Sequence, residues 1–351
     1  MANDLRGRIL LVALALLLTC PPSPPKASAF AEASADRRRP GGGWSARLDA
    51  ARTRDAGGIG AQSYSKGQNV SPGYEGWEQN ADGSFNFLFG YMNRNWEEEI
   101  EVPIGPENSI EPGGPDQGQP THLLPRRNRF VFRVRVPNDW GQKELVWTLT
   151  TKGKTEKAFA TLRPDYFVDD VVMASETGAL GAGTSSPEVR ANKRPAVRID
   201  GDKTRSVRMG QPLQLVAWVT DDGVPKPRGA GQSARQAAAG RGEDTGRGRN
   251  PALIPPSRVT VGKRTGLHLS WFMYRGAGKV TFDPAQIKVW EDTRTGANSP
   301  WAPLWVPPPV PPDGKHVVQA TFDAPGTYVL RARADDGALV EDDELTITVT
   351  R

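Results

Sequence analysis

The sequence predicts an all-β protein that contains two sandwich domains. Glycine and proline are abundant, with 38 and 31 copies in 351 residues, and only 37% of the residues are hydrophobic. This balance favours short strands and long loops over helices. Apolar and polar residues alternate with a period of two in many short runs, and Gly, Pro or Asn-Asp bounds most of them. Such a pattern is typical of half-buried strands.

The first 29 residues have the pattern of a secretory signal. Arg6 and Arg8 precede the apolar run 9–19, which is too short to cross a bilayer. The small residues Ala27-Ser28-Ala29 then provide a cleavage site. We therefore expect an exported protein, periplasmic or secreted, whose mature chain starts near Phe30. No later stretch is apolar enough for a transmembrane segment.

The only cysteine, Cys20, lies at the end of this signal. A chain cut after Ala29 has no disulfide, which fits a bacterial envelope protein better than a disulfide-stapled secreted domain. Leu17-Leu18-Thr19-Cys20 also resembles a lipobox, so a lipoprotein anchored through Cys20 is the alternative, although Thr19 departs from the usual Gly, Ala or Ser.

The charge pattern argues against a nucleic-acid partner. The formal net charge is +5, and residues of opposite sign are interspersed along the chain. Interspersed charge promotes solubility and does not form the basic stripe that nucleic-acid binding requires.

The first half contains a predicted arm followed by a predicted sandwich. Residues 30–68 lack periodicity and indicate a flexible N-terminal arm. A first β-sandwich is expected over 69–167, because alternation returns at sandwich spacing. Its strands are predicted at 85–89, 130–136, 145–151 and 156–162.

A Gly-, Ala- and Ser-rich linker at 168–195 leads to a second predicted sandwich over 196–351. Its strands are predicted at 196–199, 206–209, 213–220, 267–274, 280–282, 287–290, 317–322, 327–334 and 344–350. The Pro-Gly turn at 325–326 and the Asp-Gly turn at 336–337 make the last strands the closing hairpin of an immunoglobulin-like (Ig-like) sandwich. Residues 228–250, rich in Gly, Ala and Arg, are predicted to be a disordered insertion within it.

Four segments of the second half resemble a polycystic-kidney-disease-type Ig-like repeat over about 196–350. They are Ala217-Trp-Val-Thr-Asp-Asp-Gly-Val-Pro225, Ser270-Trp271, Gly276-Ala-Gly-Lys-Val-Thr-Phe282 and the segment from Ala320 to Gly337. The insertion at 228–250 and the Trp/Pro stretch at 300–312 are longer than such a repeat needs. The resemblance implies a non-catalytic adhesion, spacer or carbohydrate-associated module. It also suggests that Trp271 lies at the centre of the sandwich.

The first half is similar to uncharacterised exported bacterial proteins. The similarity rests on Tyr74-Glu-Gly-Trp77 and Gly114-Pro-Asp-Gln-Gly-Gln-Pro120. It implies export and adds no activity.

Carboxylates are the candidates for chemistry. Glu97, Glu99 and Glu101 would share one face of a strand at 96–101, and two facing carboxylates can hydrolyse a glycosidic bond. No apolar pocket is predicted there to raise the pKa of an acid, so we expect these glutamates to lie on a solvent-exposed face of the strand. The pairs Asp221-Asp222, Asp335-Asp336 and Asp342-Asp343 could contribute to a calcium site, but turn-forming aspartate explains them without a cofactor.

Histidine and tryptophan provide the remaining candidates. His122, His268 and His316 are far apart in sequence and do not indicate zinc, and His268 is expected to point outward. Trp147, Trp218 and Trp271 are expected in cores. Trp301 and Trp305, in the Pro-rich stretch, are the candidate ligand-binding residues, and the alternative is that they pack on their own sandwich.

These observations predict a non-enzymatic exported module that binds or supports an envelope protein or polysaccharide. No G-x-S-x-G, P-loop, Rossmann or H-E-x-x-H pattern occurs. A catalytic or accessory component of extracellular glycan hydrolysis is the alternative function.

Overall fold

The computed structural model describes residues 66–177, 187–227, 265–286 and 310–351. Within these ranges the chain is all-β, with two sandwiches and three short helices, so the predicted fold class is confirmed. Both sandwiches belong to one compact unit, Ile59–Arg351. The predicted signal peptide with Cys20, most of the predicted arm, the insertion at 228–250 and the strand at 287–290 lie outside the described residues. Trp301 and Trp305 lie outside them too.

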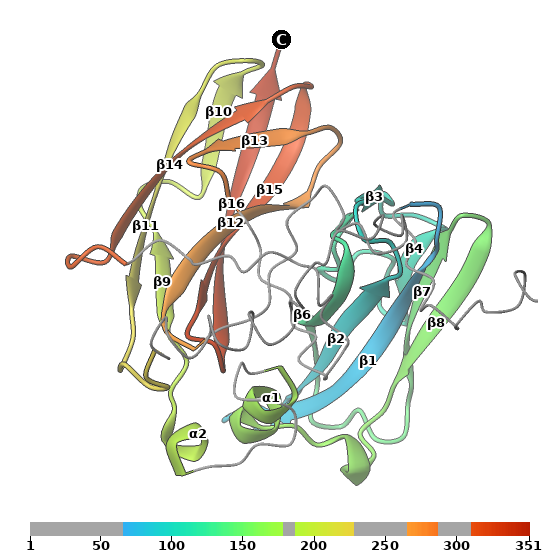
Figure 1. Ribbon diagram of the computed structural model, residues 1–351. Helices are drawn as coiled ribbons and strands as arrows, with labels where there is room; N and C mark the ends of the chain where they lie inside the picture. The colour runs from blue at the N-terminus through green and yellow to red at the C-terminus, as the bar shows by residue number, and fades with distance from the viewer. Residues whose placement is uncertain (1–65, 178–186, 228–264, 287–309) are drawn as a thin grey trace, which may run out of the picture. The chain divides into compact units, whose positions relative to one another are not determined.

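The first sandwich contains two three-stranded antiparallel sheets and a two-stranded ribbon (Figure 1). One sheet has the order β1-β2-β6, with β1 at Val70–Gln79, β2 at Phe85–Asn93 and β6 at Arg126–Val136. The other has the order β4-β7-β8, with β4 at Asn108–Glu111, β7 at Leu145–Thr151 and β8 at Lys154–Ala160. The ribbon pairs β3 (Ile100–Glu101) with β5 (His122–Leu123).

Aromatic rings fill the first core. Phe89 on β2 stacks on Phe132 of β6 with ring centroids 5.2 Å apart, and Trp147 of β7 packs edge-on against both rings. The Trp147 indole N–H donates a hydrogen bond to Asn108 Oδ1 at 3.0 Å, which satisfies its polar atom inside the core. The predicted alternation thus turns the large rings of both sheets inward.

The second sandwich follows the strand plan of an immunoglobulin domain. One sheet has the order β13-β14-β11-β9 and the other β10-β16-β15-β12. The bounds are β9 Ala196–Ile199, β10 Thr204–Arg208, β11 Leu213–Thr220, β12 His268–Arg275, β13 Val280–Asp283, β14 Lys315–Phe322, β15 Gly326–Asp335 and β16 Val340–Thr350. In immunoglobulin terms the first is the A-B-E-D sheet and the second is the C-F-G sheet, which β10 extends by parallel pairing with β16.

Two core residues mark this plan. Trp271 on β12, the C strand, is 1% exposed and lies in the second core, as the sequence suggested. Tyr328, near the start of β15, is fully buried, and its hydroxyl donates to the carbonyl of Ala324 at 2.8 Å or that of Ala277 at 2.6 Å. A tyrosine at this corner that bonds back to the preceding loop is a hallmark of immunoglobulin-type sandwiches. Trp218, in contrast, is only partly buried and lies outside the core cluster, because it is on the outer face of β11.

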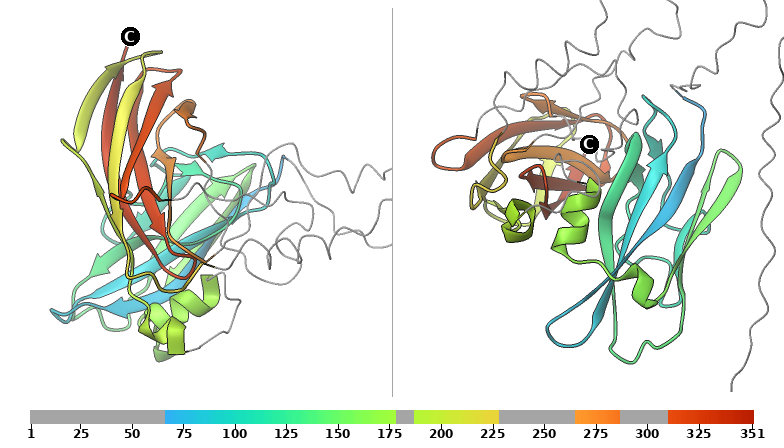
Figure 2. Two further views of the ribbon diagram at one scale, coloured as in Figure 1. Left: turned by 60° about the vertical axis from the view of Figure 1, so that its left-hand side comes forward. Right: turned by 60° about the horizontal axis from the view of Figure 1, so that its bottom comes forward.

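The predicted linker contains helices that the sequence analysis missed. They are α1 (Asp170–Thr177) and α2 (Pro187–Ala191), and the 3₁₀ helix η1 (Pro164–Tyr166) precedes them within the predicted bounds of the first sandwich. Met173 and Ala174 of α1 pack into a cluster with Leu88 and Phe130 of the first sandwich and with Leu339 of the second. Figure 2 shows α1 beside the strands of both sandwiches. No helix in the described ranges combines the length and the apolar character needed to cross a bilayer.

A β-bulge in β6 positions the contact between the halves. The β2–β6 register shifts between Phe89 and Tyr91, and Phe130 has a left-handed φ of 48°. A bulge turns a side chain away from the regular pleat. Here it places Phe130 in the cluster with α1, while Phe132 stays in the first core. Gly90 lies opposite, where a Cβ would come within 2.4 Å of the Asn128 carbonyl oxygen.

Candidate functional site at the junction of the two sandwiches

Two buried arginines on β15 lie where the two sandwiches meet. Leu330 and Ala332 point into the second core, so Arg331 and Arg333 point to the opposite face of the C-F-G sheet. They are 6% and 3% exposed, respectively. A buried cation is tolerated only with partners, so this face is built around their contacts.

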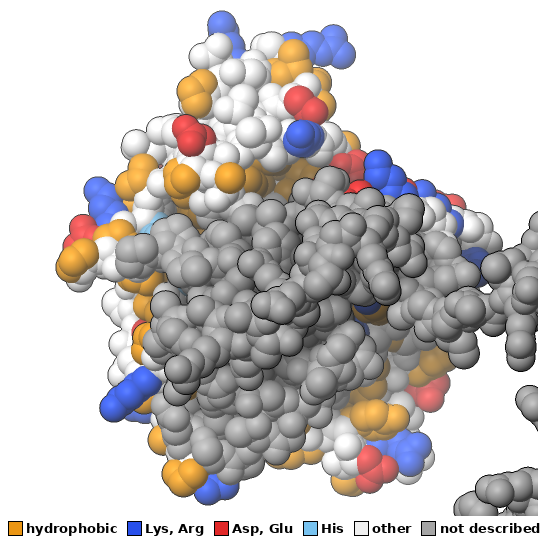
Figure 3. Space-filling view, in the orientation of Figure 1, with side chains coloured by type: hydrophobic (Ala, Val, Ile, Leu, Met, Phe, Trp, Pro, Cys, Tyr) orange, Lys and Arg blue, Asp and Glu red, His pale blue; other side chains and the backbone are white. Residues whose placement is uncertain are grey.

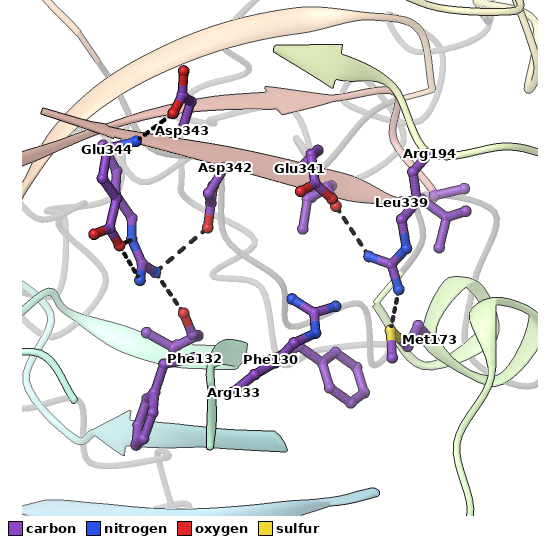
Figure 4. A pocket seen from close by; sticks show the side chains of 14 residues that line it. Phe130, Phe132, Arg133, Met173, Arg194, Leu339, Glu341, Asp342, Asp343 and Glu344 are labelled. Atoms are coloured by element: carbon purple, nitrogen blue, oxygen red, sulfur yellow. Dashed lines mark hydrogen bonds and ion pairs between the residues drawn. The ribbon is translucent and has the colours of Figure 1, made fainter. Parts of the chain in front are cut away.

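Arg331 connects the two sandwiches directly. Its guanidinium donates to the carbonyl of Val131 in the bulge of β6, a residue 200 positions away in the sequence. It also donates to Glu344 Oε1 from Nε at 2.7 Å, and it lies 3.4 Å from the centroid of the Tyr274 ring. Figure 4 shows Asp342 and Glu344 of β16 on the side of the pocket that faces Phe132 of the first sandwich.

Arg333 completes an ionic ladder across β15 and β16. Its Nε and Nη2 donate to the two oxygens of Asp342, each at 2.7 Å. Because Arg331 also reaches Asp342 Oδ2 at 3.4 Å, one carboxylate serves both cations. The neighbouring Asp343 faces the other way, where it pairs with Lys203 and accepts the Ile199 N–H.

A pocket of about 330 Å³ lies beside this ladder. Phe130, Met173 and Leu339 supply apolar wall, and Arg194 and Glu341 supply charge. Arg194 is satisfied by Asp170 and by the Val340 carbonyl. Burial raises the pKa of Glu341, and nearby arginines oppose that shift. Since most of its charged side chains are already paired, we interpret the pocket as part of the packing between the two sandwiches.

A second set of contacts fixes the other end of the junction. Arg275 of β12 forms a bidentate ion pair with Asp116, at 2.8 and 3.0 Å, and donates to the Gln119 carbonyl at 2.9 Å. Tyr274 is buried in the first core although it belongs to the second sandwich. Its hydroxyl donates to the Gly118 carbonyl, so the loop at 116–121 holds β12 by polar and apolar contacts together.

At this end, two of the predicted glutamates lie beside the side chain of His122. Its Nε2 lies 3.0 Å from Glu99 Oε2 and its Nδ1 lies 3.8 Å from Glu101 Oε1. Burial of the ring opposes its charge, but the two carboxylates outweigh burial and raise the pKa of His122. Glu101 Oε1 also accepts the N–H of Gly278 in the second sandwich at 3.2 Å. The two carboxylates therefore favour the charged form of His122, and Glu101 also carries the contact to the second sandwich.

This arrangement differs from the predicted strand at 96–101. Only Ile100–Glu101 is extended, because the side chain of Asn93 accepts the N–H of Asn95 at 3.0 Å and turns the chain after β2. The pKa of Glu101 is lowered, chiefly by His122, whose Nδ1 lies 3.8 Å from Glu101 Oε1. The general acid of a glycosidase needs a raised pKa, so the lowered pKa of Glu101 does not suit that role.

Two of the three predicted aspartate pairs, Asp335-Asp336 and Asp342-Asp343, are occupied by the protein's own groups. Asp336 Oδ1 accepts the N–H groups of Ala338 and Leu339 at 2.6 and 2.7 Å, and its Oδ2 accepts from Asn192 at 2.9 Å. Burial raises the pKa of Asp336 to about 6. Asp335 Oδ1 accepts the Gly337 N–H at 2.7 Å. Within the described ranges, no group of three acidic, His or Cys side chains is placed to hold a metal ion.

His268 was expected to point outward into solvent, but the structure buries it. It is 2% exposed, and its Nε2 lies 3.9 Å from Asp335 Oδ2. The alternation correctly directs it away from Leu269 and Trp271, but that face of β12 is covered. The described surface in Figure 3 carries scattered charges of both signs, as the interspersed sequence charges suggested.

Comparisons with known proteins show loose structural likeness. No protein-family model matches the chain, and no curated protein does so significantly. Domains 4 and 5 of the S-layer protein SbsC align with a TM-score of 0.22 and 8% identity, over 60% of this chain and 66% of that one. The adhesin InvE of Yersinia pseudotuberculosis aligns at 0.20 and 10%, over 82% and 61%.

The fibronectin(III)-like modules of Clostridium thermocellum CbhA align at a TM-score of 0.19 and 9% identity, over 80% of this chain and 94% of that one. The aligned region covers 66% of the structure of SbsC domains 4 and 5, and 28% of each of two longer SbsC structures. At these scores the likeness identifies neither a family nor a ligand.

Proposed function

We propose that the protein is an exported, non-enzymatic module of the bacterial cell envelope that binds or supports an envelope protein or polysaccharide. The observation that carries the proposal is the junction. Arg331 donates to the Val131 carbonyl, Arg275 pairs with Asp116, and Glu101 accepts the Gly278 N–H, so three polar contacts join the two sandwiches. A body built this way transmits force and presents surfaces without a catalytic step.

The predicted signal sequence supports an exported location, and the resemblance of the second half to a polycystic-kidney-disease-type repeat supports the class of module. In the described residues, two of the three glutamates that could have served glycan hydrolysis, Glu99 and Glu101, lie beside His122, and the pKa of Glu101 is lowered. Such a pair supports a structural role, because a general acid must keep its proton near neutral pH.

To test the proposal, the full chain with its own N-terminus is expressed in a bacterial host, and its processing and location are determined. We expect a processed protein outside the cytoplasm that begins near Phe30, and co-sedimentation of the purified mature chain with isolated envelope fragments. An unprocessed cytoplasmic chain would contradict the proposal.

The same envelope polysaccharides are then incubated with the mature chain and assayed for new reducing ends. We expect none. Release that is lost in Glu99→Gln and kept in the neighbouring Glu97→Gln would establish glycan hydrolysis instead.

A further inference from the structure

The outer face of the A-B-E-D sheet is the broad face of the second sandwich that points away from the junction. The junction uses the outer face of the opposite sheet, through Arg331 of β15. In the A-B-E-D sheet, β9, β11, β14 and β13 are neighbours in that order (Figure 1). Ala217 of β11 points into the second core, so Val216 and Trp218 point outward. The strand register then decides which side chains meet on this face.

One row of this face places an aromatic ring between two cations. Trp218 lies directly opposite Lys315 of β14 and Arg198 of β9. The Lys315 ammonium is 5.6 Å from the centroid of the Trp218 ring. The Arg198 side chain is 66% exposed and lies 3.7 Å from Asp200, whereas Lys315 is exposed and pairs with no carboxylate in the described ranges. The row therefore presents an excess of positive charge to solvent.

The next two rows continue the face with apolar and amide groups. Val216 lies opposite Val317, which is 43% exposed. Gln214 lies opposite Gln319, and neither amide side chain hydrogen-bonds to the part of the chain that the structure describes. Asp283 of β13 ends this last row, opposite Gln319. The three rows span about 13 Å along β11, at ~3.4 Å per residue.

The Trp218 ring offers a ligand its carbon surface. The side chain is partly exposed, but its indole nitrogen is buried and has no hydrogen-bond partner among the described residues. The polar contacts of a ligand on this face must therefore come from the cations beside the ring and from the glutamines.

We propose that this face binds an acidic polysaccharide, with a sugar ring on Trp218 and its carboxylate on Lys315 or Arg198. The C–H face of a sugar ring is apolar and matches an aromatic surface, and its hydroxyl groups need donors and acceptors, which glutamine amides supply together. Charge complementarity places the anion, because the cations lie in the Trp218 row and Asp283 lies in the row farthest from it. The inference rests on the proposed function and names the class of envelope polysaccharide.

Two other classes of partner fit this face less well. Anionic membranes are recognised by clusters of roughly 4–8 basic residues, and the Trp218 row has two. A stable protein interface buries about 800 Å² on each partner around an apolar centre. The apolar side chains in these rows are only Val216, Trp218 and Val317.

The test measures binding of the mature full chain to polygalacturonate and to its methyl ester, which keeps the backbone and removes the charge. Alginate serves as a second acidic polymer. By isothermal titration calorimetry, we expect the methyl ester to bind up to about fivefold more weakly than the acid form for each ion pair lost. Binding of the acid form should also weaken in about 1 M salt, where the screening length falls to ~3 Å.

Variants locate the site. Lys315→Gln and Arg198→Gln should each weaken polygalacturonate binding by up to about fivefold, and Trp218→Ala should weaken it by about tenfold because the aromatic surface is lost. Lys154→Gln is the matched control, since it removes an exposed lysine from β8 of the first sandwich. The two exposed cation variants decide the question if Trp218→Ala does not fold.

Equal binding of acid and ester, equal effects of Lys315→Gln and Lys154→Gln, or no binding to either acidic polymer would overturn the inference. So would binding to phosphatidylglycerol vesicles without binding to polygalacturonate, which would assign the face to a membrane. The proposed function is judged separately. Co-sedimentation with envelope fragments that persists in Lys315→Gln and Arg198→Gln would leave that function in place and contradict only the acidic-polysaccharide site.

Discussion

Asp336 shows how burial of one residue gives the protein a pH dependence. The carboxyl group is fully buried, and burial raises its pKa to about 6 although it accepts three hydrogen bonds. The folded state therefore holds a proton that the unfolded chain has already released between about pH 4 and 6. Stability from this group is present below pH 4 and is lost as the pH rises to about 6.

We expect Asp336→Asn to remove this loss. The Asn192 amide can turn its unpaired Oδ1 toward the new amide, so the hydrogen bonds can be kept. The variant should gain up to ~3 kcal/mol relative to the natural chain between pH 4 and pH 7, as the shift in pKa implies. Urea unfolding at pH 4, 5, 6 and 7 measures it, and a difference that stays constant with pH would argue against a raised pKa.

Trp271 tests the second core. Its ring is 1% exposed, so Trp271→Ala should lower the free energy of unfolding by roughly 3–5 kcal/mol. Phe159→Ala is the control, because Phe159 is 52% exposed and should change stability by less than about 0.5 kcal/mol. Thermal or chemical unfolding measures both variants. An unchanged melting temperature for Trp271→Ala would exclude its burial.

The corner between β14 and β15 tests a single element of the immunoglobulin plan. Tyr328→Phe keeps the buried ring and removes only the hydroxyl that reaches Ala277 and Ala324. We expect a loss of about 1–2 kcal/mol, because buried carbonyl oxygens lose a donor. Chemical unfolding of the variant measures the loss, and a variant as stable as the natural chain would mean that water replaces the hydroxyl.

Strands were predictable where one face is apolar and the other is polar. β7, β9 and β11 have the predicted bounds, because their burial alternates with the sequence. β1 was missed, since its run Ser-Pro-Gly-Tyr-Glu-Gly has no period of two and much of it is half-buried. The helix α1 was missed because an Ala- and Ser-containing stretch beside glycines resembles a linker.

The junction was not predictable, for a different reason. Alternation shows that His268 and Arg331 point away from their own core, but it does not show what covers them. The partner of Arg331 is the carbonyl of Val131, a backbone group with no sequence signal, and the bulge that presents it depends on Gly90. Trp301 and Trp305 stay predictions.

The two sandwiches should unfold together. Arg331→Met keeps a long side chain and removes the charge that holds Asp342, Glu344 and the Val131 carbonyl. Breaking a buried pair this way should cost roughly 3–5 kcal/mol. Calorimetry should show one transition for the natural chain and a lower, broadened or split transition for the variant. Arg208→Met, at an exposed position of β10, should behave like the natural chain.

The most direct measurement is the distance between the two sandwiches in solution. Spin labels at Lys157→Cys on β8 and Thr348→Cys on β16 occupy exposed positions, one in each sandwich. Double electron–electron resonance on the mature chain should give one narrow distance distribution, which Arg331→Met broadens and Arg208→Met leaves unchanged. A broad distribution in the natural chain would contradict the account, because its sandwiches would then move independently.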